Sequence, residues 1–194
     1  TPKFAAEHLS ILLQGKHEVV AVLTQPDRKS GRGKKISFSA VKEIALKNNL
    51  EVLQPVSLKD SEIQESLSNL EPDIILVVAY GLLVPKSVLD LPKLGCINIH
   101  ASLLPRWRGA SPIESCIAAG DSESGITMMK MSEGLDEGPI LRKFVCHLDE
   151  KETLETLENK FIGMSSENLL QFLKDYENKK INEVLQPTTG STYA

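Results

Sequence analysis

Apolar segments of strand length alternate with helical segments along this chain, and this alternation limits the fold more than any other feature. The segments 18–24 (EVVAVLT) and 74–79 (IILVVA) are apolar runs, and apolar residues recur at helical spacing in 4–13, 39–48 and 59–70. Strands that are apolar on both faces are typical of parallel sheets covered by helices on both sides. The pattern predicts an α/β protein with a mostly parallel central sheet flanked by helices.

The second half of the chain continues this alternation. We expect a strand at 96–100, and a helix at 111–120 that begins with a capping box and ends at a glycine. Two further strands, 126–131 and 141–147, suggest a hairpin-like extension of the sheet, and 152–178 is a long amphipathic helical region.

The first two residues are typical of a helix start. Thr1 suits an N-cap and Pro2 suits the first helical position. A chain that opens at a helix without methionine leads us to expect a preceding segment, which in an alternating α/β chain is a β-strand. We therefore expect that the first strand of the sheet is missing from this sequence.

Composition and charge exclude several classes of protein. The 22 Lys and Arg residues against 26 Asp and Glu give a net charge of −4, which argues against a chain that coats nucleic acid over its whole surface. The three cysteines, Cys96, Cys116 and Cys146, are too few and too widely spaced for a disulfide framework. Because the sequence contains neither an apolar run of about 20 residues nor a signal peptide, we expect a cytoplasmic protein without membrane association.

One short segment is strongly basic within this acidic chain. Five of the 22 basic residues fall within eight positions, flanked by Asp27, and the segment contains two glycines. Such a segment is either a solvated loop or a flexible arm that binds an anion such as a phosphate backbone. The five basic residues are Arg28, Lys29, Arg32, Lys34 and Lys35.

Polar residues with catalytic chemistry cluster between residues 95 and 138. Asn98 and His100 share one face of the predicted strand 96–100, and Asp136 lies in the glycine-flanked segment 134–138. In open α/β sheets, ligands bind at the carboxyl ends of the strands. An amide and an imidazole can stabilise the oxyanion formed when a nucleophile attacks a carbonyl, and a carboxylate can orient the imidazole. Each residue also has a structural interpretation, since strand histidines are often structural and an aspartate between glycines is often a turn residue.

A metal site is disfavoured in the same region. Cys96 and His100 share a strand face, but four residues of strand separate them by about 13 Å, which is too far for one zinc ion. We therefore expect no metal.

The segment resembles the family of formyltransferases that use 10-formyltetrahydrofolate. The resemblance is carried by Asn98-Ile99-His100, Ser102-Leu103-Leu104-Pro105, Arg108-Gly109, Pro112, Gly125-Ile126-Thr127 and Gly134-Leu135-Asp136-Glu137-Gly138. It implies a Rossmann-like formyltransferase fold, with Asn98, His100 and Asp136 as catalytic residues. It also implies that Ser102, Leu103, Leu104 and Pro105 bind the folate, and that the Tyr80-Gly81-Leu82 turn contributes to the wall of the pterin pocket.

Within this family, the chain is most similar to the branch that formylates methionyl-initiator tRNA for translation initiation. The similarity is carried by Thr24-Gln25-Pro26-Asp27-Arg28, Gly31-Arg32-Gly33-Lys34-Lys35 and Gln54-Pro55-Val56-Ser57. It implies that the basic loop, through Arg28, Arg32, Lys34 and Lys35, holds the acceptor end of the tRNA.

The resemblance also implies a domain organisation. Residues 1–185 would form the catalytic domain without its first strand, and 186–194 would begin a linker to a C-terminal β-barrel domain. We expect a monomer. Two alternatives remain: a relative that formylates a small amine (glycinamide ribonucleotide or an amino sugar nucleotide) or hydrolyses formyltetrahydrofolate, and a non-catalytic module that binds tRNA or folate.

Overall fold

The computed structural model describes residues 3–30 and 35–194, and it describes side chains outside 28–36. Helices and strands alternate along the described chain, as the sequence predicts. The helices are α1 (Lys3–Leu12), α2 (Ala40–Lys47), α3 (Ser61–Asn69), α4 (Lys86–Leu89), α5 (Pro112–Ala119) and α6 (Leu154–Glu177). The strands are β1 (Val22–Leu23), β2 (Arg28–Ser30), β3 (Lys35–Ser37), β4 (Val52–Leu53), β5 (Ile75–Val77), β6 (Cys96–His100), β7 (Glu123–Lys130) and β8 (Ile140–His147).

The strands form one large sheet and two small pairs. β1 pairs with β4 in parallel, and β2 pairs with β3 in antiparallel orientation. The large sheet has the order β5-β6-β7-β8, in which β5 and β6 are parallel whereas β7 runs antiparallel to both β6 and β8. The predicted α/β architecture is confirmed, and so is the predicted hairpin-like extension, which is β7 and β8.

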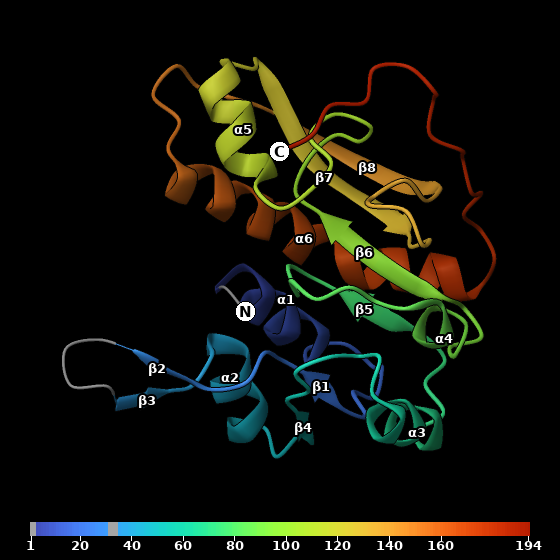
Figure 1. Cartoon of the computed structure of the whole chain (residues 1–194). Coiled ribbons are helices and arrows are strands. Elements are labelled where there is room, and N and C mark those ends of the chain that lie inside the picture. The colour runs from blue at the N-terminus through green and yellow to red at the C-terminus, as the bar shows by residue number, and fades with distance from the viewer. Residues whose placement is uncertain (1–2, 31–34) are drawn as a thin grey trace.

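One face of the large sheet is covered by helices and forms the main core. Figure 1 shows α6 running along this face, with α1 and α5 beside it. Ile97 and Ile99 of β6 belong to the same buried cluster as Phe161 and Phe172 of α6. Because side chains alternate along a strand, Asn98 and His100 project from the opposite face, away from this core.

An apolar cavity of about 500 Å³ lies between β1 and β5 and is lined by residues of both strands. The predicted strand 18–24 is reduced to Val22–Leu23, because in the described structure β1 pairs with β4 over only two residues. The predicted N-cap at Thr1 lies outside the described residues. The strand expected ahead of it stays a prediction.

The capping box predicted at the start of α5 is wrong. Ser111 precedes the helix, but its ψ of 49° differs from the extended conformation of a typical N-cap, and its side chain makes no capping hydrogen bond. A capping box instead opens α6, where Thr153 and Thr156 bond reciprocally. The predicted end of α5 is confirmed, since Gly120 adopts the left-handed conformation with φ 67°.

None of the helices among the described residues is long and apolar enough to cross a membrane.

Candidate active site

Strand β6 places two polar side chains on the face of the sheet opposite the α6 core. Asn98 and His100 are two residues apart and therefore project in the same direction. In the antiparallel register, Thr127 of β7 lies directly opposite His100, so its side chain shares this face. The site is thus built on the rigid centre of the sheet, and the remaining groups come from the loops above it.

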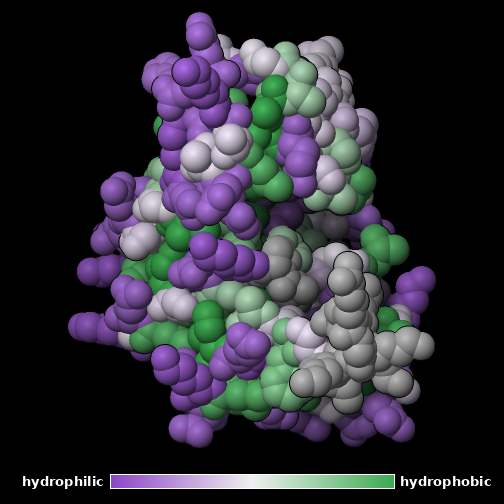
Figure 2. All heavy atoms as spheres, turned by 90° about the vertical axis from the view of Figure 1, so that its left-hand side faces the viewer, coloured by the Kyte–Doolittle hydropathy of each residue, from purple (hydrophilic) through white to green (hydrophobic). Residues whose placement is uncertain are grey.

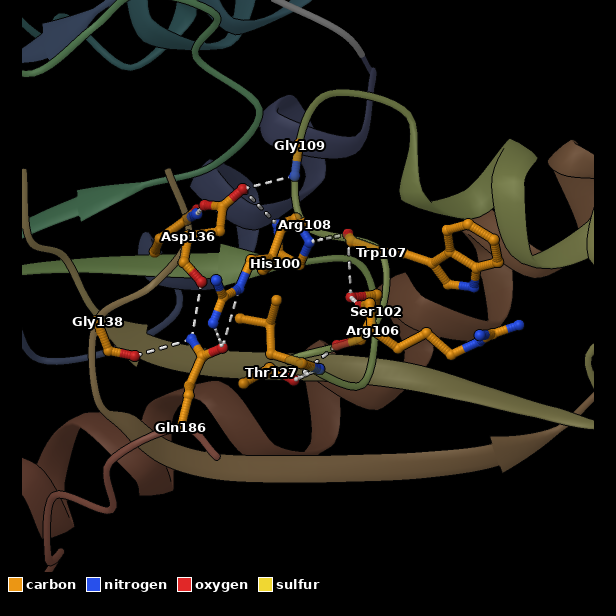
Figure 3. Close-up of polar contacts among 12 residues, drawn as sticks. His100, Ser102, Arg106, Trp107, Arg108, Gly109, Thr127, Asp136, Gly138 and Gln186 are labelled. Atoms are coloured by element: carbon orange, nitrogen blue, oxygen red, sulfur yellow. Dashed lines mark hydrogen bonds and ion pairs between the residues drawn. The ribbon is translucent and has the colours of Figure 1, made fainter. Parts of the chain in front are cut away.

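The carboxylate of Asp136 joins the two β6 side chains. Asn98 Nδ2 donates to Asp136 Oδ1 at 3.0 Å, and His100 Nδ1 lies 3.6 Å from Asp136 Oδ2. The backbone N–H of Gly109 donates to Oδ2 at 2.9 Å. Asp136 has a φ of 51°, in the left-handed region, so its backbone conformation is held by its surroundings. The structure therefore brings together all three predicted catalytic residues (Figure 3).

The imidazole of His100 has an oxygen acceptor near each ring nitrogen. Its Nε2 lies 2.7 Å from the carbonyl oxygen of Trp107, on the side opposite Asp136. A backbone carbonyl oxygen can only accept a hydrogen bond, so His100 Nε2 is the donor to Trp107. The side chain is only 5% exposed and is therefore held in one orientation.

The predicted folate loop, 102–105, is fixed to β7 by a single buried hydroxyl. Thr127 Oγ1 donates to the carbonyl of Ser102 at 2.6 Å and accepts from the N–H of Leu104 at 3.1 Å. Ser102 and Leu104 are fully buried, whereas Leu103 and Pro105 are half-buried. The side chains of Ser102 and Leu104 therefore stabilise the loop from inside, and the surface that a ligand can reach is formed by Leu103 and Pro105.

Arg108 and Gln186 are residues of the site to which the sequence assigns no role. The Arg108 side chain is 9% exposed, and its Nη1 donates to Glu137 Oε1 at 3.1 Å. Its Nε and Nη2 donate to Gln186 Oε1 at 3.2 and 2.9 Å (Figure 3). No local pattern identifies Gln186, because it comes from the tail after α6 and reaches the site only through the tertiary fold.

A second group of polar side chains lies beside the loop that follows Leu103. Arg106 donates to both carboxylate oxygens of Asp121, at 2.9 and 2.6 Å, and Trp107 Nε1 donates to Asp121 at 2.8 Å. The Arg106 guanidinium, followed by the Trp107 donor, holds the pKa of Asp121 below its usual value. These residues line a cavity of about 290 Å³. The contacts fix the outer side of the loop whose carbonyl at Trp107 accepts from His100.

Tyr80, expected in the wall of the pterin pocket, is buried in the structure. Its hydroxyl has no hydrogen-bond partner among the described residues, and burial raises its pKa to about 12. Tyr80 also lines the apolar cavity between β1 and β5. Its role in pterin binding stays a prediction.

The predicted tRNA-binding loop lies in and beside β2 and β3. Arg28 begins β2 and Lys35 begins β3, but their side chains are outside the structural description, and Arg32 and Lys34 lie outside the described residues. Figure 1 shows β2 and β3 extending away from the sheets. Figure 2 shows this side of the molecule, where hydrophilic side chains gather along the left of the view and apolar ones appear between them in both the upper and the lower part.

The base of this loop is anchored by contacts outside it. Lys42 Nζ donates to Asp27 Oδ2 and to Gln54 Oε1, each at 2.6 Å, and Gln54 Nε2 donates to Asp27 Oδ1 at 2.9 Å. The Lys42 hydrogen bond, with a smaller contribution from Gln54, lowers the pKa of Asp27. The segment containing Gln54, singled out in the sequence, thus supports the basic loop.

Within the described part of the chain, no group of three or more His, Cys, Asp or Glu residues could hold a metal ion. The Cys96 thiol lies 3.7 Å from the carbonyl of Val88, and burial raises its pKa to about 12. A thiol with such a pKa stays protonated at neutral pH and is a poor metal ligand.

This fold is shared with known proteins. The chain belongs to the formyl transferase family, whose model matches residues 1–173. It is 50% identical over 194 residues to methionyl-tRNA formyltransferase from Idiomarina loihiensis, a match that covers 100% of this chain and 61% of that protein. The chain thus spans about 61% of the length of the curated relatives it matches.

Solved structures confirm the predicted Rossmann-like formyltransferase fold. Glycinamide ribonucleotide transformylase 1 from Symbiobacterium toebii has a TM-score of 0.77 at 18% identity, covering 92% of this chain and 89% of that one. The N-formyltransferase from Helicobacter canadensis, in complex with folinic acid and dTDP-3-aminofucose, has a TM-score of 0.74 at 18% identity. That match covers 100% of this chain and 67% of the other.

Proposed function

We propose that this chain is the catalytic domain of an enzyme that transfers the formyl group of 10-formyltetrahydrofolate to the α-amine of methionyl-initiator tRNA. The observation that carries the proposal is the Asp136 carboxylate, which accepts from Asn98 and lies 3.6 Å from His100. The name shared by relatives about 50% identical to the chain supports the tRNA substrate. We propose residues 1–185 as this domain, and the tail 186–194 contacts the site through Gln186, Thr192 and Ala194.

In the proposed reaction, the amine nitrogen attacks the formyl carbon and forms a C–N bond. The carbonyl electrons move to oxygen, giving a tetrahedral oxyanion. This intermediate collapses by breaking the bond between the formyl carbon and N10 of the folate. The amine loses one proton and N10 gains one, so the products are the formylated amine and tetrahydrofolate.

We assign each of the three side chains a role in this reaction. Asn98 and His100 supply the donors that stabilise the oxyanion, and for His100 this requires Nε2 to exchange the Trp107 carbonyl for the oxyanion as its acceptor. One Asn98 N–H bonds to Asp136, and the amide keeps a second N–H. Asp136 orients His100 and accepts the proton released by the attacking amine, which N10 receives as it leaves.

The folate co-substrate is supported by the family and by the loop beside the site. Members of the family use formyltetrahydrofolate, and the Helicobacter canadensis relative was solved with folinic acid. We place the folate against the loop 102–105, where Leu103 and Pro105 offer accessible apolar surface. No metal takes part in the proposed chemistry.

The tRNA is proposed to bind the basic loop through Arg28, Arg32, Lys34 and Lys35. Phosphate contacts of this kind provide affinity that falls as salt rises. The contacts of Asp27 with Lys42 and Gln54 hold the start of the loop. The monomeric state and cytoplasmic location stay predictions.

Steady-state formylation of charged initiator tRNA by the full-length protein tests the catalytic assignment. His100→Ala and Asp136→Asn are each expected to lower kcat by roughly 10²- to 10³-fold, the usual effect of removing one such group, while folate affinity is retained. Asp90→Asn is the matched control, because Asp90 is the exposed C-cap of α4 and its side chain accepts from Lys86. Near-normal turnover in both site variants would refute the assignment.

Substrate class is tested by the salt dependence of KM and by alternative acceptors. Arg32→Ala should raise KM for the charged tRNA and reduce the slope of log affinity against log salt by about 1, without changing folate affinity. Lys59→Ala serves as a control on a loop outside the basic segment. Efficient formylation of glycinamide ribonucleotide or an amino sugar nucleotide, or release of formate from the folate alone, would favour the alternatives. Folate binding without any transfer would favour a non-catalytic module.

A further inference from the structure

We propose that Gln186 is a positioning residue that holds the Asp136 loop in its working conformation, an inference that rests on the proposed catalytic role of Asp136. Gln186 lies in the tail after α6, 50 residues from Asp136 in the sequence, and it touches the loop through its side chain. Its Nε2 donates to the carbonyls of Asp136 and Gly138, at 2.7 and 2.9 Å.

Every polar atom of the Gln186 carboxamide is engaged. While Nε2 donates to the two carbonyls of the Asp136 loop, Oε1 accepts from Nε and Nη2 of Arg108, at 3.2 and 2.9 Å. The third nitrogen of the same guanidinium, Nη1, donates to Glu137 Oε1 at 3.1 Å. One carboxamide therefore ties the loop that carries Asp136 to the loop that carries Arg108 (Figure 3).

The Asp136 loop depends on such external contacts. Asp136 has a φ of 51°, a conformation that a non-glycine residue keeps only where the surroundings hold it. Gln186 bonds to the carbonyl of Asp136 itself and to that of Gly138, so it fixes the backbone on which the carboxylate is mounted. The position of the carboxylate, 3.0 Å from Asn98 and 3.6 Å from His100, follows from that backbone.

The tail is also attached to the second loop of the site. The N–H groups of Trp107 and Arg108 donate to Oγ1 and to the carbonyl of Thr192, both at 2.9 Å. The N–H of Ala194 donates to the Arg108 carbonyl at 2.7 Å. This loop supplies the Trp107 carbonyl to His100 and the Gly109 N–H to Asp136. The tail therefore contacts both loops that surround the catalytic groups.

Gln186→Glu in the full-length protein separates the two functions of the carboxamide. Glutamate has the same shape and can still accept from Arg108, but its ionised form cannot donate to the carbonyls of Asp136 and Gly138. We expect kcat to fall at least tenfold, since small displacements of catalytic groups cost up to about 10²-fold. KM for folate and for tRNA should stay within about twofold. Gln171→Glu makes the same chemical change on exposed α6, where Gln171 donates to Asp175, and should leave kcat unchanged.

A double-mutant cycle shows whether Gln186 acts through Asp136. In an Asp136→Asn background, Gln186→Glu should change kcat less than twofold, because the group it positions has already lost its charge. A loss in that background as large as in the wild type would overturn the inference, and so would near-normal kcat in Gln186→Glu alone. Asp136→Asn with normal turnover would instead refute the proposed catalytic role.

A second variant covers the case in which Gln186→Glu does not fold. Gln186→Met keeps the length of the side chain and removes all its polar contacts without adding charge. It should show the same kcat loss and the same dependence on Asp136. Its Tm should lie above the assay temperature, which shows that the variant is folded in the assay. Full activity in a folded Gln186→Met protein would also overturn the inference.

Discussion

Replacing Thr127 by valine should destabilise the protein although the two side chains have nearly the same size. The Thr127 hydroxyl is fully buried and has two partners: it donates to the Ser102 carbonyl at 2.6 Å and accepts from the Leu104 N–H at 3.1 Å. Ser102 and Leu104 are also fully buried, so water cannot replace the hydroxyl without rearrangement. Valine would leave one backbone acceptor and one backbone donor unpaired.

The size of the effect follows from these two groups. Leaving one buried polar group unpaired costs about 1–3 kcal/mol, so with two such groups Thr127→Val should lower the free energy of unfolding by about 2–6 kcal/mol. Thr127→Ser keeps the hydroxyl and loses one methyl group, which costs about 1 kcal/mol. Thr127→Val, which conserves the side-chain volume, is therefore expected to destabilise the protein more than Thr127→Ser.

Thermal unfolding of the wild type and the two variants measures this difference. For a domain of this size, 1 kcal/mol corresponds to a shift in Tm of about 2–4 °C, so Thr127→Val should melt roughly 4–24 °C below the wild type. Thr127→Ser should melt within about 4 °C of the wild type. A Tm for Thr127→Val equal to or above that of Thr127→Ser would refute the reasoning that the hydroxyl holds the folate loop.

Two further predictions concern pH and glycine positions. Burial lowers the pKa of His8 to about 4 from 6.5, so the unfolded chain binds a proton in a range where the folded chain does not. The contribution of the neutral His8 side chain to the free energy of unfolding is complete above pH 6.5 and should fall by up to about 3 kcal/mol as pH drops toward 4. In His8→Gln, the Tm should depend less on pH over this range. An equal slope of Tm against pH in the two proteins would contradict the assignment. In Gly138→Ala, the new Cβ would lie 1.9 Å from the Lys130 carbonyl oxygen, so the loop carrying Asp136 must shift, and kcat should fall at least tenfold. Gly163→Ala in α6 is the control, because its Cβ meets nothing within 4 Å; it should raise stability by about 0.5–1 kcal/mol with unchanged kcat.

Periodic segments were predicted well because their spacing reflects burial directly. The strand 96–100 matches β6 along its whole length, since its alternating apolar and polar residues follow the two faces of the sheet. The strand 18–24 was predicted longer than β1, because apolar character indicates burial but does not show how many residues find a pairing partner. The prediction that Ser111 caps α5 is wrong because residue type alone does not determine the backbone angle ψ.

The candidate site also contains some features that the sequence predicts and others that it does not. The chemistry of Asn98, His100 and Asp136 was visible in the sequence, and the structure brings the three side chains together. Nothing in the sequence indicates that Ser102 and Leu104 are buried beneath their loop, or that Gln186 contacts the loop of Asp136. Those facts depend on which segments meet in space.

Local geometry with a period of a few residues suffices to predict that the chain alternates helices and strands, and that Asn98 and His100 share one face of a strand. The contacts of Thr127 with the folate loop and of Gln186 with the loop of Asp136 appear only once the chain is folded. These contacts join residues 23 to 50 positions apart, and their partners are mostly backbone groups, which every residue carries. Such pairing has no signature in side-chain chemistry and is set when the loops close over the sheet.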